Sequence, residues 1–189
     1  MLLKVIPYVR FTTYYTSFRG WKYQRGYALL QPGDILVGVD KKKLTHLLIE
    51  GTFSHAIQCV AKGTEFECAE MTHHNFTRSC FFDICKEADR VVILRCRDYD
   101  AAYIEKVIAA CLSHADATYN VTFELGIPAL YCSELIYISD VEKRLQVSLA
   151  DLAGLGRPYI SPDGLYQAKN VDVIWDSDQE IPDPKLGQF

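Results

Sequence analysis

The sequence predicts an α+β domain whose sheet is largely antiparallel. Apolar segments of strand length come first and are joined by short turns, whereas clear helical patterns follow later in the chain. With 189 residues, 49% of them hydrophobic, the chain has the size and composition of one globular domain. No internal repeat and no linker divides it, so we expect a single domain over residues 1–189.

The first half of the chain contains most of the predicted strands. Turn residues at 31–34 precede a first apolar run, and Lys62-Gly63 forms a second turn whose flanking strands should pair as a hairpin. The expected strands are Ile35–Val39, 53–60, 65–71 and Arg90–Cys96. Short helices are expected near residues 44–50 and 77–87, the second because of its apolar side chains.

Helices dominate the second half. Residues 98–115 have the clearest apolar stripe, and Asp98 or Asp100 can cap this helix. Another helix is expected to begin at Cys132, with residues 142–144 on its polar face. A last strand is expected at 171–175. At the two ends of the chain we expect an N-terminal extension of helix or irregular structure (1–30) and an acidic tail (176–189).

Basic residues are concentrated near the N-terminus. The first 43 residues contain eight of the 20 Lys and Arg residues but two of the 24 Asp and Glu residues. We favour an ordinary solvated face over a nucleic-acid surface, while peripheral membrane contact through residues 1–30 stays open. No apolar run has the length of a membrane span, and the first residues do not resemble a signal peptide, so we expect a cytoplasmic protein.

The seven cysteines do not form a recognisable disulfide or metal framework. They are scattered without a CxxC pair, which favours a reducing compartment and thiols that pack in the core. Cysteines and histidines between residues 59 and 85 could suggest zinc, but structural zinc ligands usually come as pairs two to four residues apart. Only His73 and His74 are close in sequence, and neighbouring residues of a strand point apart. We expect no metal and no cofactor.

Cys132 is the residue most informative about function. An apolar, turn-prone segment ends at this cysteine, and Leu135, Ile136 and Ser139 follow at helical spacing. A thiol in the first turn of a helix lies at the positive end of the helix dipole, which lowers its pKa and favours the nucleophilic thiolate. Most free cysteines instead pack as small hydrophobic residues, so this segment alone leaves both interpretations open.

A thiolate nucleophile needs a base, and that base needs an orienting group. Among five histidines, His55 is the best candidate because it begins a strand in an otherwise apolar run, although a hydrogen-bonded core histidine would give the same pattern. Glu67 and Glu70 lie on opposite faces of the next expected strand. Glu70 shares its face with Phe66 and Cys68, where a buried carboxylate needs a partner, so Glu70 is favoured.

Four segments together resemble the YiiX/YebB-like group of circularly permuted, NlpC-type papain-like cysteine hydrolases. They read PGDIL at 32–36, SHA at 54–56, CAE at 68–70 and YCSEL at 131–135. In unpermuted relatives the cysteine helix comes first, whereas here the histidine precedes the cysteine. The resemblance covers residues 31–175, including 119–123 and 160–163. It implies a papain-like fold in which an antiparallel sheet packs against helices.

The resemblance also implies a role for each matched residue. Cys132 would be the nucleophile, His55 the general base and acid, and Glu70 the residue that orients His55. The backbone N–H of Cys132 would help to hold the oxyanion. Residues assigned more weakly to the substrate and oxyanion region are Tyr131, Ser133, Tyr119 and Asp34, the last of which we interpret mainly as structural.

Taken together, these residues predict a cysteine hydrolase that cleaves an amide through an acyl-enzyme. Its expected partner is a small peptide or acyl substrate, with cell-wall-type peptides as one candidate. Two alternatives stay open. One is a lipid-directed acyl hydrolase or acyltransferase at a membrane surface, by similarity to the lecithin retinol acyltransferase-like group. The other is a non-enzymatic binding module on the same fold.

Overall fold

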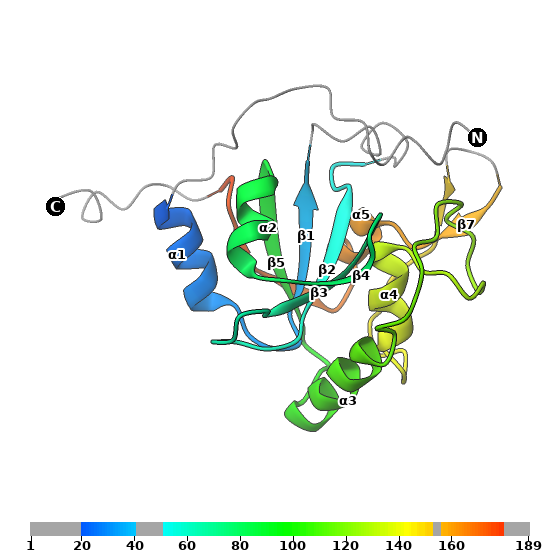
Figure 1. Cartoon of the computed structure of the whole chain (residues 1–189), viewed down its shortest axis with the longest axis horizontal. Coiled ribbons are helices and arrows are strands. Elements are labelled where there is room, and N and C mark those ends of the chain that lie inside the picture. The colour runs from blue at the N-terminus through cyan, green and yellow to red at the C-terminus, as the bar shows by residue number, and fades with distance from the viewer. Residues whose placement is uncertain (1–19, 41–50, 153–155, 180–189) are drawn as a thin grey trace, which may run out of the picture.

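A six-stranded antiparallel sheet forms the centre of the protein (Figure 1). The computed structural model describes residues 20–40, 51–152 and 156–179. The strands follow the order β4-β3-β2-β1-β5-β8, so the first two of the described strands lie in the middle of the sheet. Their bounds are β1 Ile35–Val39, β2 His55–Cys59, β3 Cys68–Thr72, β4 Asn75–Ser79, β5 Arg90–Cys96 and β8 Val171–Asp176.

Helices cover both faces of this sheet. Helices α1 and α2 lie on one side of the strands and α4 and α5 on the other, as Figure 1 shows. A small ladder of β6 and β7 lies beyond α4. The bounds are α1 Gly20–Leu29, α2 Phe81–Glu87, α3 Ala101–Leu112, α4 Cys132–Ser139, α5 Pro162–Tyr166, β6 Ala150–Asp151 and β7 Pro158–Tyr159.

The central strands are buried on both faces, which explains their continuous apolar sequences. Along β1, Ile35 and Val37 pack toward α4 and α5, whereas Leu36 packs with Phe81 and Ile84 of α2. Each of these side chains is 8% exposed or less. Burial of apolar area on both sides of the sheet therefore fixes the layer order and places α4 against β2 and β3.

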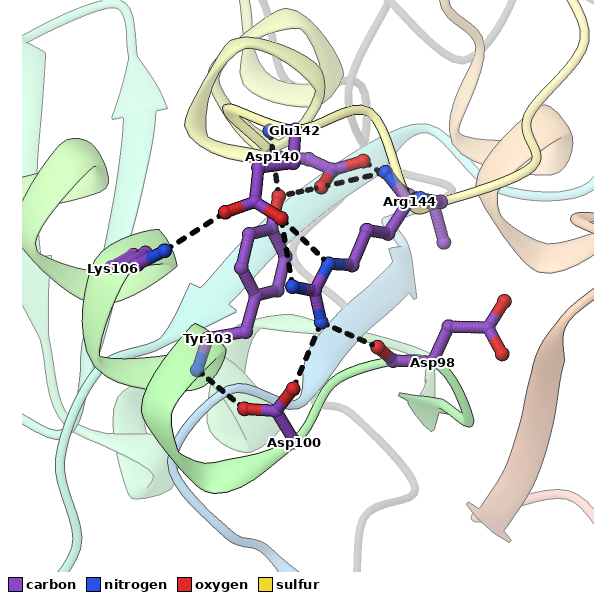
Figure 2. Close-up of polar contacts among 8 residues, drawn as sticks. Asp98, Asp100, Tyr103, Lys106, Asp140, Glu142 and Arg144 are labelled. Atoms are coloured by element: carbon purple, nitrogen blue, oxygen red, sulfur yellow. Dashed lines mark hydrogen bonds and ion pairs between the residues drawn. The ribbon is translucent and has the colours of Figure 1, made fainter.

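A polar cluster holds the C-terminal end of α4 against α3 (Figure 2). The Tyr103 hydroxyl donates to Asp140 Oδ1 at 2.5 Å and accepts from the backbone N–H of Glu142 at 2.8 Å. The Arg144 guanidinium donates to Asp100 at 2.9 Å and lies over the Tyr103 ring, 3.9 Å from its centroid. Because Asp140 caps α4, these contacts fix the far end of the helix that begins at Cys132.

Several sequence predictions are confirmed by these elements. The α+β class with an antiparallel sheet is confirmed, and the strands β1 and β5 have the predicted bounds. The predicted hairpin is formed by β2 and β3, which pair in antiparallel register. Asp100 rather than Asp98 caps α3, because its side chain accepts from the backbone N–H of Tyr103 at 2.9 Å.

Other predictions are wrong or lie outside the described residues. Residues 77–87 do not form one helix: residues up to Ser79 belong to β4, and α2 begins at Phe81 after Cys80 caps it. Residues 142–144 are not a face of the cysteine helix, because α4 ends at Ser139. The helix predicted near 44–50, most of the 1–30 extension and most of the acidic tail lie outside the described residues. None of the described helices has the length and apolar composition that crossing a bilayer requires.

Candidate active site

The strands β2 and β3 are paired at one end, and no pairing is described at the other. Their register joins Cys59 to Cys68 and Gln58 to Ala69, and the described ladder does not continue toward His55. Ala56 therefore has no partner in β3, and its backbone N–H donates instead to the thiol of Cys132. Cys132 is the first residue of α4, which packs against both strands. The Cys132 sulfur therefore lies beside the start of β2, where the described ladder between β2 and β3 has ended.

His55 and Glu70 lie on these two strands, beyond the last pair of the ladder. The Nε2 atom of His55 is 2.6 Å from Glu70 Oε2. The Ser79 hydroxyl donates to the other carboxylate oxygen, Oε1, from the neighbouring strand β4. The side chains of His55 and Glu70 are 25% and 10% exposed, so water only partly screens their charges. Since Glu70 occupies Nε2, the imidazole presents Nδ1 to the Cys132 thiol.

The thiol and the imidazole stabilise each other's charged forms. Burial raises the pKa of Cys132, which is 1% exposed, but the hydrogen bond and positive charge of His55 more than offset this and lower that pKa overall. Burial lowers the pKa of His55, whereas its hydrogen bonds to Cys132 and Glu70 raise that pKa to about 9. A thiolate beside an imidazolium is therefore the expected state near neutral pH, and this pair can act as nucleophile and acid.

Tyr131 and Ser133 flank the cysteine, but their side chains bind the protein itself. The Tyr131 hydroxyl accepts from the backbone N–H of Ile160 at 2.9 Å, and the Ser133 hydroxyl donates to the Ile160 carbonyl at 2.7 Å. Both side chains are fully buried. They therefore hold the first turn of α4 against the segment before α5, and only their backbone groups are available near the sulfur.

Tyr119 lies close to Cys132, on a loop that Glu134 ties to the same helix. Tyr119 forms a β-bridge with Leu130. Burial and the nearby negative charge of Cys132 raise the pKa of Tyr119. The Glu134 carboxylate accepts from the backbone N–H of Gly126 at 3.2 Å and from that of Tyr131 at 3.4 Å. Glu134 is 1% exposed, and its burial raises its pKa. This carboxylate thus joins the loop to the start of the cysteine helix.

The structure does not bring Asp34 to this site. Arg95 donates to Asp34 through Nε at 2.7 Å and Nη2 at 2.8 Å, and the carboxylate also accepts from the backbone N–H of Gln31. Asp34 precedes β1, whereas the β1 residue that pairs with His55 is Gly38, at the other end of the strand. The geometry agrees with the structural interpretation of Asp34.

The alternative orienting carboxylate, Glu67, is also engaged elsewhere. It accepts from the Tyr27 hydroxyl at 3.2 Å and from the backbone N–H of Phe81 at 3.1 Å, so it joins α1 and α2 to the sheet. Sequence reasoning overlooked two residues of the site, Ser79 and the buried Glu134. Glu134 lies at the third position of α4, where a glutamate can reach back to the backbone N–H of the N-cap residue, and this spacing from the predicted helix start could have indicated it. Ser79 gave no such signal, because its contact depends on the β3–β4 pairing.

A cavity of about 400 Å³ opens beside His55 and Glu70 on the α2 side of the sheet. Cys132 is not among the described residues that line it. Within the described ranges, His, Cys, Asp and Glu side chains nowhere gather in a group of three or more that could hold a metal ion. The cysteines and histidines considered for zinc are thus not assembled into such a group there.

A family model for the "permuted papain-like amidase enzyme, YaeF/YiiX, C92 family" matches residues 29–177. The chain belongs to this family. It is therefore a cysteine hydrolase of the amidase or peptidase type, and the predicted permuted papain-like fold is confirmed. A solved structure from Escherichia coli O157:H7, described as "metalloprotein yiiX", superposes with a TM-score of 0.63 and 14% sequence identity. The match covers 75% of this chain and 94% of that one. A search among curated proteins finds no match.

Proposed function

We propose that the protein is an amidase in which Cys132, His55 and Glu70 form the catalytic triad. The observation that carries this proposal is the hydrogen-bonded series from Ser79 through Glu70 and His55 to the thiol at the start of α4. Each member depends on the one before it. Ser79 and the strand position Glu70, Glu70 orients the imidazole, and the imidazole ionises the thiol.

The first half of the reaction forms an acyl-enzyme. The Cys132 thiolate attacks the amide carbonyl carbon, and the carbonyl π electrons move to oxygen. Backbone N–H groups in the first turn of α4, including that of Cys132, stabilise this oxyanion, and one such donor typically contributes about 3 kcal/mol. The His55 imidazolium then donates its proton to the departing nitrogen. The C–N bond breaks, which leaves a thioester and a neutral imidazole.

The second half of the reaction hydrolyses the thioester. Neutral His55 takes a proton from water while the water oxygen attacks the acyl carbon. Collapse of the second tetrahedral intermediate expels the Cys132 thiolate, and the imidazolium beside it stabilises the leaving sulfur. The enzyme thereby returns to its starting ion pair. We propose amide-linked peptides, with cell-wall-type peptides as the first to be tested, as the substrate of this reaction.

Thiol alkylation tests the proposed ion pair without knowledge of the substrate. Cys80 is a natural internal control, because it is half-buried and its pKa is raised chiefly by burial. In brief iodoacetamide labelling near pH 6 followed by peptide mass mapping, we expect Cys132 to react much faster than Cys80 despite its lower exposure. The variant His55→Ala should remove this advantage. Equal labelling of the two cysteines in the wild-type protein would contradict the proposal.

A further inference from the structure

Glu134 is a buried carboxylate whose partners are neutral hydrogen-bond donors. It lies two residues after Cys132 and is 1% exposed. Within the described chain it accepts from the backbone N–H groups of Gly126 and Tyr131, and from the side-chain amide of Asn120. A buried carboxylate is costly even when hydrogen bonds satisfy it, so packing alone would favour an apolar side chain here. Its presence beside the nucleophile therefore indicates a more specific role.

Asn120 and Glu134 together hold the peptide unit that joins Leu130 to Tyr131. The carbonyl of this unit accepts from the backbone N–H of Asn120 at 2.9 Å. Its N–H donates to the Glu134 carboxylate at 3.4 Å. The Asn120 side chain is 2% exposed and also donates to Glu134, so the two residues bind each other as well. Both ends of this peptide unit are thus fixed by one buried cluster.

The next peptide unit, which joins Tyr131 to Cys132, bears the N–H proposed to hold the oxyanion. Its carbonyl accepts from the backbone N–H of Leu135 at 3.0 Å, which fixes one side of the unit. Among the described residues, the N–H on its other side meets no acceptor, so it is available to a substrate oxygen. Because peptide units are planar, the direction of this N–H depends on the backbone dihedrals of Tyr131, whose own N–H is held by Glu134.

We infer that Glu134 is a positioning residue for the oxyanion, because it fixes the backbone from which the Cys132 N–H points. The inference rests on the proposed amidase function and adds to it a residue that acts on the transition state without touching the substrate. The hydrogen bond from His55 ionises the thiol, and none of the contacts of Glu134 within the described ranges reaches His55. Loss of the Glu134 carboxylate should therefore weaken oxyanion stabilisation and leave the thiolate in place.

Two reagents distinguish these two effects on the same sulfur atom. Iodoacetamide reacts at a saturated carbon: the Cys132 thiolate forms a C–S bond as iodide leaves, and no oxyanion develops. p-Nitrophenyl acetate reacts at a carbonyl carbon, so its oxygen becomes an oxyanion before p-nitrophenolate departs and leaves an acetyl thioester. Both rate constants can be measured at one pH on the full chain, by peptide mass mapping and by the burst of p-nitrophenolate absorbance. Cys132→Ala is the blank for both.

Glu134→Gln keeps the shape of the side chain but turns an amide NH2 toward groups that are themselves donors. We expect the acetylation rate constant to fall about tenfold and the iodoacetamide rate constant to stay within about twofold of the wild-type value. Asn120→Ala removes one donor to the carboxylate and should lower acetylation alone by about threefold. Ser139→Ala removes a buried hydroxyl at the far end of α4 and should leave the ratio of the two rate constants unchanged.

A purely structural role for Glu134 would lower both rate constants together, because a disordered helix start loses the thiolate as well as the oxyanion site. That result, or an unchanged ratio in Glu134→Gln, would overturn the inference, and rapid labelling of wild-type Cys132 would still leave the amidase proposal standing. If Glu134→Gln does not fold, the ratio in Asn120→Ala decides in the same way. Slow labelling of wild-type Cys132 would remove the amidase proposal and this inference with it.

Discussion

The two ends of the β2–β3 pair place cysteines in opposite chemical environments. At the paired end, Cys59 and Cys68 face each other across the ladder, and both are 0% exposed. A hydrogen bond to Cys59, followed by burial, raises the pKa of Cys68 far above its usual range. At the unpaired end, Cys132 is 1% exposed, yet its pKa is lowered because His55 lies beside it.

This difference shows that burial alone does not determine whether a thiol is reactive. Removal from water favours the neutral thiol at both ends, and at Cys132 the hydrogen bond and positive charge of His55, together with backbone N–H groups, reverse the effect. At the unpaired end the thiol has two partners that the paired end lacks, namely the imidazole of His55 and the backbone N–H of Ala56. The local break in the ladder is thus a chemical feature of the proposed site.

The largest difference is expected when the cysteine at each end of the β2–β3 pair is replaced by alanine. Cys132→Ala should lower kcat/KM for an amide substrate by on the order of 10³-fold or more, because no nucleophile remains. Cys68→Ala should leave kcat/KM nearly unchanged but lower the free energy of unfolding by about 1–3 kcal/mol, since it leaves a small void in the core. Steady-state kinetics and urea unfolding measure both quantities. Substantial hydrolysis by Cys132→Ala would contradict the role of Cys132 as the nucleophile.

A smaller effect is expected when the imidazole loses its orienting carboxylate. Glu70→Gln should lower kcat/KM by about 10- to 100-fold, because the ring keeps a hydrogen-bond partner but loses a negative charge beside it. Glu67→Gln is the matched control: Glu67 lies near Glu70 in sequence but binds Tyr27 and the start of α2, so it should affect stability more than rate. Equal rate losses in the two variants would contradict a specific role for Glu70.

The pH dependence of kcat/KM provides a second test of the role of Glu70. The pKa of His55 is raised to about 9, so the imidazolium needed to protonate the leaving group is present below about pH 9 and is lost above it. At low pH, activity should fall as the Cys132 thiolate becomes protonated. Since Glu70 helps to raise the pKa of His55, Glu70→Gln should move the alkaline limb of the kcat/KM profile to lower pH. An alkaline limb that stays in place would show that Glu70 does not support the imidazolium.

The sequence specifies part of this arrangement locally. Continuous apolar runs bounded by turns predicted β1 and β5, and the two-residue period of β3 placed Glu70 on the face where it meets His55. The helix start at Cys132 followed from the change between a turn-prone and a helical pattern. Each of these features depends on neighbouring residues, which is why one sequence suffices to predict it.

The features that were missed depend on tertiary contacts. Strand β4 has mostly polar, partly exposed residues and forms because it pairs with β3. Its own sequence therefore does not predict a strand. The contact of Ser79 with Glu70 depends on that pairing. The β2–β3 ladder likewise ends where α4 packs against both strands, and no period in either strand predicts that end.

A modest effect is expected from Ser79, which acts on the imidazole only through Glu70. Ser79→Ala removes one hydrogen bond to the carboxylate and should lower kcat/KM by about fivefold, the equivalent of about 1 kcal/mol. Its alkaline limb should shift in the same direction as that of Glu70→Gln, but less. Ser113→Ala, which removes a hydroxyl at the end of α3, should change neither quantity. A full rate with an unmoved pH profile in Ser79→Ala would place Ser79 outside the proposed site.

The smallest effect on rate is expected at the far end of α4. Tyr103→Phe removes the hydroxyl that binds Asp140 and the backbone N–H of Glu142, which should lower the free energy of unfolding by about 1–3 kcal/mol. The start of α4 is held independently, because Tyr131 and Ser133 bind Ile160 there. We therefore expect kcat/KM and the labelling rate of Cys132 to stay at wild-type values while the urea midpoint falls. A loss of labelling in parallel with stability would instead mean that both ends of the helix must be anchored for the thiol to meet His55.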